Sequence, residues 1–365
     1  MTTPELEVTA PDETSGLPID LPVEEPAASP ASVPDIVDEV PVKKGRRGKV
    51  IFLAFLAIVF AVTAIVGGWY LISRKPLPEV LPGIVTVKLP SFAFAIYGIS
   101  KPMGVAVSPS GDRIYVAETE GGRYLHVYDG KGQQLASVAP PGSTQGSRVP
   151  AYVAVDPLTG SVYVSDRMKG SIYVYDRDGT YLSTFVPKPA MSTFLPLGLA
   201  FDTAGNLYVG DLDPAFHRVL VFGRDGVLTR TVGTVGTFNF PNGLAVDGAG
   251  NLYVANSNDG RVLVFDATGK ETGSIPRGVG TGELGLPRGI ALDDQTRLYV
   301  VDTTGQAIQI YATGQADGRP KYVGTAGEEG TGDGQFEYPF GAATDTRGRI
   351  YVADWANDRV QVWSY

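Results

Sequence analysis

The chain has 365 residues, with 46 glycines, 27 prolines, two histidines and no cysteine, and its formal net charge is −9. The lack of cysteine excludes disulfides, thiolate metal sites and a cysteine nucleophile, and two histidines leave little for metal-hydrolase or acid–base chemistry. The excess negative charge lies in the first 42 residues, which hold ten acids and no lysine or arginine.

The N-terminal segment, residues 1–49, is predicted to be disordered. In addition to the ten acids, residues 1–42 contain eight prolines, and they contain no aromatic residue. Such a stretch cannot bury enough apolar surface to offset the entropy lost on ordering. A basic cluster with five lysines and arginines follows at residues 43–49. We interpret the segment as an acidic, proline-rich tail, either a solvated spacer or a docking tail, that ends in a basic juxtamembrane cluster.

Residues 50–72 are predicted to form a transmembrane helix, because these 23 residues carry no charge. A helix of this length spans about 34 Å, enough for a hydrocarbon core of about 30 Å. The segment lies too deep in the chain and is too long for a cleaved signal peptide. Five lysines and arginines precede it, whereas Arg74 and Lys75 follow it. This asymmetry predicts a cytoplasmic N-terminus and an extracytoplasmic C-terminal domain. Residues 73–90 are predicted to be a linker.

Residues 91–365 contain six copies of one pattern, in which a proline precedes a short apolar run and a Tyr-Val pair follows 12 or 13 residues later. The prolines are Pro102, Pro150, Pro196, Pro241, Pro287 and Pro339. Alternating side chains and turns rich in glycine, aspartate and asparagine predict three short β-strands per copy. Self-similarity at about 46 residues indicates one large repeat domain.

Comparison of the six copies predicts a closed ring of blades. Each first strand holds an alanine, which fits sheets that converge on a central axis, as in a β-propeller. These alanines are Ala106, Ala154, Ala200, Ala245, Ala291 and Ala343. The sixth copy ends at its third strand, and a strand-like run at residues 92–98 precedes the first proline. We expect this run to supply the missing fourth strand and close the ring.

The sixth copy carries a family resemblance. Its segments 336–341 (Phe-Glu-Tyr-Pro-Phe-Gly), 348–354 (Gly-Arg-Ile-Tyr-Val-Ala-Asp) and 357–363 (Asn-Asp-Arg-Val-Gln-Val-Trp) resemble NHL repeats. The fourth copy also resembles the related YVTN repeats. The resemblance covers roughly residues 92–365 and implies an all-β, six-bladed propeller of the NHL type. Because some relatives with this fold are metal-dependent enzymes, the resemblance implies a lyase or hydrolase that uses the channel as an alternative function.

The residues whose side chains could bind a metal or take part in catalysis are expected to have structural roles. His217 matches the His-Arg of the repeat signature, and His126 aligns with bulky side chains of other copies, so we expect neither a metal site nor a bound cofactor. An acid or amide follows the Tyr-Val motif in all six copies, and this recurrence predicts a shared structural hydrogen bond. These residues are Glu118, Asp166, Asp211, Asn256, Asp302 and Asp354. No Ser/His/Asp arrangement is expected, and no catalytic residue is assigned.

Surface recognition is the function that we predict. The candidate face carries the loops that lead into the first strands and those between the second and third strands. The residue after each proline differs between copies, and Tyr152 replaces a glycine of the other five, so it should narrow or plug the channel mouth. Aromatic residues and arginines are favoured at binding hot spots, although ordinary loop variation is the alternative interpretation. The candidate binding residues are Tyr152, Arg167, Asn242, Arg288, Phe340 and Trp355.

Nucleic-acid binding requires a basic face, whereas residues 76–365 carry 23 lysines and arginines against 29 acids. We therefore expect no nucleic-acid partner. The sequence predicts a single-pass cell-membrane protein whose extracytoplasmic propeller binds an envelope or surface protein, a peptide or a glycan.

Overall fold

The computed structural model describes residues 55–64, 87–315 and 318–365, which fall into two compact units divided after Ile84. In the first unit, residues 55–64 form a helix, and Phe55, Ile58 and Phe60 on it are all strongly exposed. No helix within the described ranges is both long and apolar enough to cross a membrane. The predicted span at residues 50–72 lies largely outside these ranges, so it stays a prediction.

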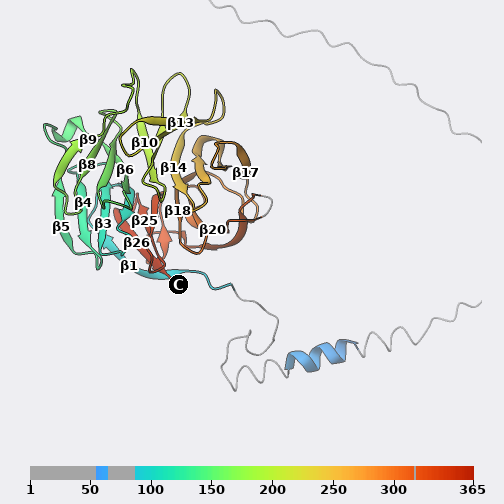
Figure 1. Ribbon diagram of the computed structural model, residues 1–365. Helices are drawn as coiled ribbons and strands as arrows, with labels where there is room; N and C mark the ends of the chain where they lie inside the picture. Colours follow the sequence, from blue (N-terminus) through green and yellow to red (C-terminus); the bar gives the residue numbers. More distant parts are fainter. Residues whose placement is uncertain (1–54, 65–86, 316–317) are drawn as a thin grey trace, which may run out of the picture. The chain divides into compact units, whose positions relative to one another are not determined.

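The second unit consists of six antiparallel four-stranded sheets (Figure 1). Blades one to three contain β2 (Pro102–Val107), β3 (Arg113–Glu118), β4 (Leu125–Asp129) and β5 (Gln134–Val138); β6 (Pro150–Val155), β7 (Val162–Asp166), β8 (Ser171–Tyr175) and β9 (Tyr181–Thr184); and β10 (Pro196–Phe201), β11 (Leu207–Asp211), β12 (Arg218–Phe222) and β13 (Leu228–Val232). Blades four to six contain β14 (Pro241–Val246), β15 (Leu252–Asn256), β16 (Arg261–Phe265) and β17 (Glu271–Ile275); β18 (Pro287–Leu292), β19 (Arg297–Asp302), β20 (Ala307–Ala312) and β21 (Lys321–Ala326); and β24 (Pro339–Thr344), β25 (Arg349–Asp354), β26 (Arg359–Ser364) and β1 (Ser91–Tyr97). Short elements complete the fold: η1 (Gln145–Ser147), η2 (Ser257–Asp259) and the parallel pair β22 (Glu328–Glu329) and β23 (Gln335–Phe336).

The first strands of the blades form the inner ring. Each of them contacts the first strands of both neighbouring blades, and β24 of blade six contacts β2 of blade one, so the ring is closed. Strand β1 pairs antiparallel with β26 and places Phe92 opposite Trp363 and Ile96 opposite Val360. In Figure 1, β1 lies beside the red C-terminal strands. The predicted six blades and their closure by the N-terminal strand are confirmed.

The alanines of the first strands contribute to packing between blades. Ala106 packs with residues of blades one and two, and Ala245 packs with residues of blades four and five. The central cavity is lined instead by the residue before each alanine, for example Val105 and Leu199. The expectation that the alanines mark the axis is therefore corrected. A small side chain is needed there because adjacent sheets approach each other closely near the centre.

The glycines of the first strands meet a stricter requirement. A Cβ atom on Gly289 would lie 2.2 Å from the Phe340 carbonyl oxygen, and one on Gly341 would lie 2.5 Å from the Met103 carbonyl oxygen. The neighbouring blade's backbone thus occupies the space that a side chain would need. Blade two, which has Tyr152 at this position, instead uses Ser165: its hydroxyl accepts a bond from the Tyr152 amide and donates to the Leu197 carbonyl.

The residue after each Tyr-Val motif holds the loop that leads into its own blade. Asp354 accepts a hydrogen bond from the Glu337 amide at 2.8 Å, and Asp211 accepts one from the Leu195 amide at 2.8 Å. Glu118, Asp166, Asn256 and Asp302 accept equivalent bonds. The predicted shared structural hydrogen bond is confirmed.

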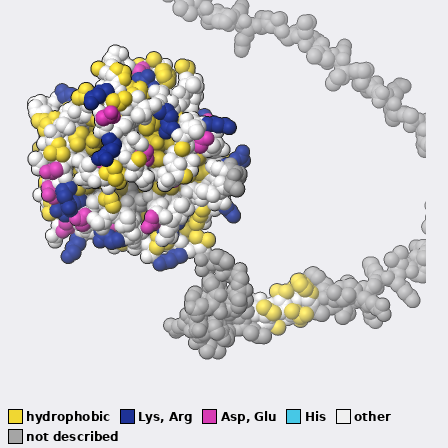
Figure 2. All heavy atoms as spheres, viewed as in Figure 1, with side chains coloured by type: hydrophobic (Ala, Val, Ile, Leu, Met, Phe, Trp, Pro, Cys, Tyr) yellow, Lys and Arg dark blue, Asp and Glu magenta, His cyan; other side chains and the backbone are white. Residues whose placement is uncertain are grey.

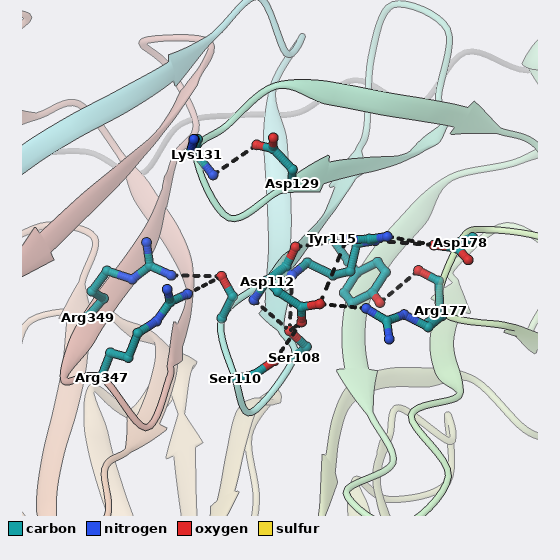
Figure 3. A network of polar contacts seen from close by, with 12 residues as sticks. Ser108, Ser110, Asp112, Tyr115, Asp129, Lys131, Arg177, Asp178, Arg347 and Arg349 are labelled. Atoms are coloured by element: carbon teal, nitrogen blue, oxygen red, sulfur yellow. Dashed lines mark hydrogen bonds and ion pairs between the residues drawn. The ribbon is translucent and has the colours of Figure 1, made fainter.

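A polar network joins blades six, one and two on the face opposite the lead-in loops (Figure 3). Arg349 of blade six donates to the Gly111 carbonyl at 2.8 Å and to the Gly130 carbonyl at 3.0 Å, both in blade one. Asp112 of blade one pairs with Arg177 of blade two at 2.6 Å. Hydrogen bonds from Ser110 and Ser108, and then Arg177, hold the pKa of Asp112 well below its ordinary value. The network reinforces the ring where its ends meet.

Candidate binding face at the channel mouth

Tyr152 lies across the central channel. Its hydroxyl, which comes from blade two, donates to Asn242 Oδ1 of blade four at 3.2 Å and lies 3.5 Å from the Arg288 carbonyl of blade five. Blades two and five are opposite in a ring of six, so the side chain crosses the axis. The ring packs with Met103, Leu197 and Phe340. Burial raises the pKa of the phenol, which therefore stays neutral and acts as a donor. The expected narrowing of the channel mouth is found.

Asn242 anchors this plug from the far side. Its amide nitrogen donates to the Ser257 hydroxyl at 2.8 Å, and that hydroxyl donates to the Pro287 carbonyl at 2.6 Å. These hydrogen bonds satisfy polar groups that would otherwise be buried without partners in the apolar packing around Tyr152. Asn242 and Tyr152 are both buried, so neither offers the open surface that the sequence suggested.

A stack of cationic and aromatic side chains lies beside the plug. The Arg288 guanidinium lies 4.4 Å from the centre of the Phe340 ring, and Phe340 lies 5.8 Å from Trp355. The Lys101 ammonium lies over the Trp355 ring, 5.2 Å from its centre. Arg288, Phe340 and Trp355 are partly exposed. Blades five, six and one thus contribute to one continuous surface, stabilised by cation–π contacts.

The predicted site residues therefore converge. Arg167 lies in the loop between β7 and β8, on the same face as Arg288. Burial lowers the pKa of Arg288, and the positive charge of Arg167 adds to this effect. Arg167 itself is exposed. Sequence reasoning missed Lys101, whose ammonium pairs with Asp358 at 3.0 Å. Lys101 lies directly before Pro102 with a φ of 51°, and Phe240 and Tyr338 hold the equivalent position with positive φ before Pro241 and Pro339. The sequence does not indicate that the lysine among them would contact Trp355.

The channel below Tyr152 offers little room and little polarity. Its cavity measures about 40 Å³ and is lined by Val105, Tyr152, Val153, Leu199, Gly243, Leu244, Ile290, Gly341 and Ala342. A cavity of this size holds one or two water molecules. The Tyr152 hydroxyl, the one polar side-chain group in that lining, is bonded to Asn242. Across residues 55–64, 87–315 and 318–365, no three His, Cys, Asp or Glu residues are grouped to hold a metal ion.

The two histidines occupy separate structural positions. His217 Nδ1 accepts a hydrogen bond from the Phe240 amide at 2.9 Å. His126 is buried between Ser137, at 2.8 Å from Nδ1, and Glu118, at 3.4 Å from Nε2. This Ser–His–Glu array was not expected from the sequence, because its members lie on three adjacent strands and meet only through strand register. Ser137 is exposed on the outermost strand of blade one.

A larger hollow of about 370 Å³ lies between blades two and three, away from the channel mouth. Tyr163 and Phe201 form part of its wall, and the exposed cations Lys188 and Arg224 lie at its rim. None of the candidate residues of the binding face contributes to it.

Comparison with known proteins supports the assignment of a repeat and the fold. Residues 238–265, which run from the loop before β14 to the end of β16, match the NHL repeat model. A streptogramin B lyase structure is similar with a TM-score of 0.55 and 13% identity, over 75% of this chain and 98% of that one. A structure of a nidogen–laminin complex is similar with a TM-score of 0.53 and 17% identity, over 69% and 84% of the two chains. A comparison with curated proteins gave no match. At these identities the likeness concerns the fold.

Proposed function

We propose that this chain is a membrane-anchored, extracytoplasmic binding protein whose propeller recognises a protein or peptide partner at the channel mouth. The observation that carries the proposal is the convergence of non-repeating residues on one face. Tyr152, Arg288 and Phe340 come from three blades and occupy related positions after the blade prolines, yet their side chains fit one another. Partly exposed aromatic and arginine side chains around a packed centre are typical of binding hot spots.

The structure of the channel favours catalysis less than the structure of the channel-mouth face favours partner binding. The streptogramin B lyase shares the fold, so the metal-dependent lyase or hydrolase is the relevant alternative. In this chain, however, Tyr152 covers an apolar cavity of about 40 Å³, which is too small for a substrate. The fold also occurs in a nidogen–laminin complex, an assembly of two proteins.

The described part of the first unit favours the membrane anchor. Residues 55–64 are apolar apart from Thr63, and all their side chains are exposed. A helix that is apolar on every side needs an apolar surrounding. The Thr63 hydroxyl donates to the Val59 carbonyl at 2.8 Å, which satisfies the one polar side chain within the helix.

Partner capture and membrane extraction test the two parts of the proposal. The triple variant Arg288→Ala, Phe340→Ala, Trp355→Ala should lose the proteins that the wild-type chain captures from membrane extracts. Because Phe340 packs against the plug, the variant should melt a few degrees lower, so capture is measured well below its Tm. The control Leu158→Ala, Arg224→Ala, Val227→Ala removes one arginine and two exposed apolar side chains from turns of the opposite face and should retain capture.

Equal capture of the same proteins by both triple variants would refute the binding face. For the anchor, the full-length chain should stay in the membrane pellet after an alkaline carbonate wash, and protease added to intact cells should remove the propeller. Release into the supernatant would refute the anchor without affecting the binding face.

A further inference from the structure

Two arginines at the channel mouth have no acidic partner. Within the described part of the chain, no carboxylate lies within 4.0 Å of the guanidinium of Arg167 or of Arg288. Several other arginines of the propeller are paired with acids; for example, Arg218 lies 2.8 Å from Asp211, and Arg359 lies 2.7 Å from Asp354. The contrast is sharpest at Arg288, because its Nε is buried and has no hydrogen-bond acceptor.

The local environment makes this unpaired charge costly. Arg288 is partly buried over the Phe340 ring, and the nearby charge of Arg167 opposes its own. Two like charges on a partly dehydrated surface are destabilising unless an anion neutralises them. The arrangement therefore places two positive charges, without an acidic partner among the described residues, on the face that carries Phe340 and Trp355.

We propose that Arg167 and Arg288 bind the carboxylate of an acidic residue in a peptide segment of the partner, whose neighbouring apolar side chain packs on Phe340 and Trp355. This inference rests on the proposed binding function and names the ligand's chemistry. A guanidinium offers a planar fork of N–H donors that matches a carboxylate. The Phe340–Trp355 pair gives a flat apolar surface directly beside that fork.

The surroundings favour a peptide over a nucleic acid. Glu337 and Asp358 lie in loops on the same face, at the lead-in to β24 and after β25, and would repel a continuous phosphate backbone. On the side of the propeller that Figure 2 shows, basic and acidic side chains are interspersed. A single carboxylate needs only the local pair of arginines.

A random peptide library selected against the full-length chain tests the inference. The selected peptides should be enriched in aspartate or glutamate next to an apolar residue, and their affinity should fall as salt rises. The double variant Arg167→Gln, Arg288→Gln should bind them about thirtyfold more weakly, the loss typical of a hot spot. Arg288→Lys keeps the charge but not the planar fork, so it should also bind more weakly. The control Arg224→Gln removes an exposed guanidinium from the opposite face and should bind as the wild type does.

The outcomes separate this inference from the proposed function. Selected peptides without acidic enrichment that still depend on Phe340 and Trp355 would refute the carboxylate site and leave the binding face intact. A wild-type chain that selects no peptide would refute both. If amidation of the peptide C-terminus abolishes binding and Asp→Asn or Glu→Gln changes do not, the arginines bind a terminal carboxylate and the side-chain assignment is wrong. Tighter binding of a single-stranded oligonucleotide than of the selected peptides would overturn the choice of partner.

Discussion

Strand β1 should stabilise the whole propeller because its side chains join the last blade to the first. Ile96 is 5% exposed and packs with Val360 and Val362 of blade six and with Val105 and Ile114 of blade one. Its Cγ1 also approaches Gly132, in the turn between β4 and β5. Removing Ile96 therefore weakens the contact on which closure of the ring depends.

The expected cost of Ile96→Ala follows from the atoms removed. Three buried carbons are lost, worth about 2.4 kcal/mol of transfer free energy at about 0.8 kcal/mol each. The residual cavity adds to this, so we expect about 3 kcal/mol, within the range of about 2 to 5 kcal/mol for such changes. For a domain of this size the loss corresponds to a Tm lower by roughly 6 °C.

Leu135→Ala is the matched control, because it also removes three carbons but from a residue on β5 that is 52% exposed. It should change the free energy of unfolding by less than about 0.5 kcal/mol. Thermal and urea unfolding of both variants measure the difference. A deletion of residues 84–98 should lower the stability more than Ile96→Ala does and cause aggregation through the open edge of β26. A deletion of residues 76–82 should do neither. Equal melting temperatures for Ile96→Ala and Leu135→Ala would show that β1 does not hold the ring together.

Two further variants test the interior. Burial lowers the pKa of His126 below 6.5, despite the opposing effect of Glu118 at 3.4 Å, so the folded protein binds this proton less readily than the unfolded chain does. Stability should therefore be unaffected by His126 above about pH 6.5 and fall below it, by about 1.4 kcal/mol for each unit of pKa lowering, until the folded pKa is reached. In urea unfolding, the free energy of unfolding of His126→Gln should fall less than that of the wild type between pH 7.5 and pH 5.0. An identical pH dependence of the two proteins would refute a neutral buried His126. Tyr152→Phe should cost about 1 to 3 kcal/mol, because Asn242 Oδ1 then lacks the phenol donor, and an unchanged Tm would show that this hydrogen bond contributes nothing.

The fold could be predicted from the sequence because its rules act within one repeat. The prolines mark where each inner strand begins, and the alternation of apolar residues fixes which side chains are buried. The extra strand at residues 91–97 could be predicted from simple counting of strands in the sixth copy. The acids after the Tyr-Val motifs were assigned correctly because a role that recurs in every blade cannot be a single active site.

Contacts between blades could not be predicted, since the repeat does not encode how adjacent sheets are offset. The sequence could not show that Tyr152 would reach Asn242 two blades away, or that Arg288 would stack on Phe340. The burial of Tyr152 and Asn242 follows from those contacts. The array of Ser137, His126 and Glu118 was missed for a different reason, because it depends on the register of three strands within blade one.

Comparison of equivalent positions in the six blades shows which residues the architecture requires. Five blades have a glycine where one first strand passes close to the next. Blade two lacks this glycine and must offset its absence. Blade two does so through Ser165, which accepts from the Tyr152 amide and donates to the next blade. A closed propeller could be built with glycine in all six blades, so the tyrosine is not required by the fold. Its fit to Asn242 and to the surface of Arg288 and Phe340 points to a requirement of the face that these residues form. The departures from the repeat therefore locate the binding surface better than any single residue type does.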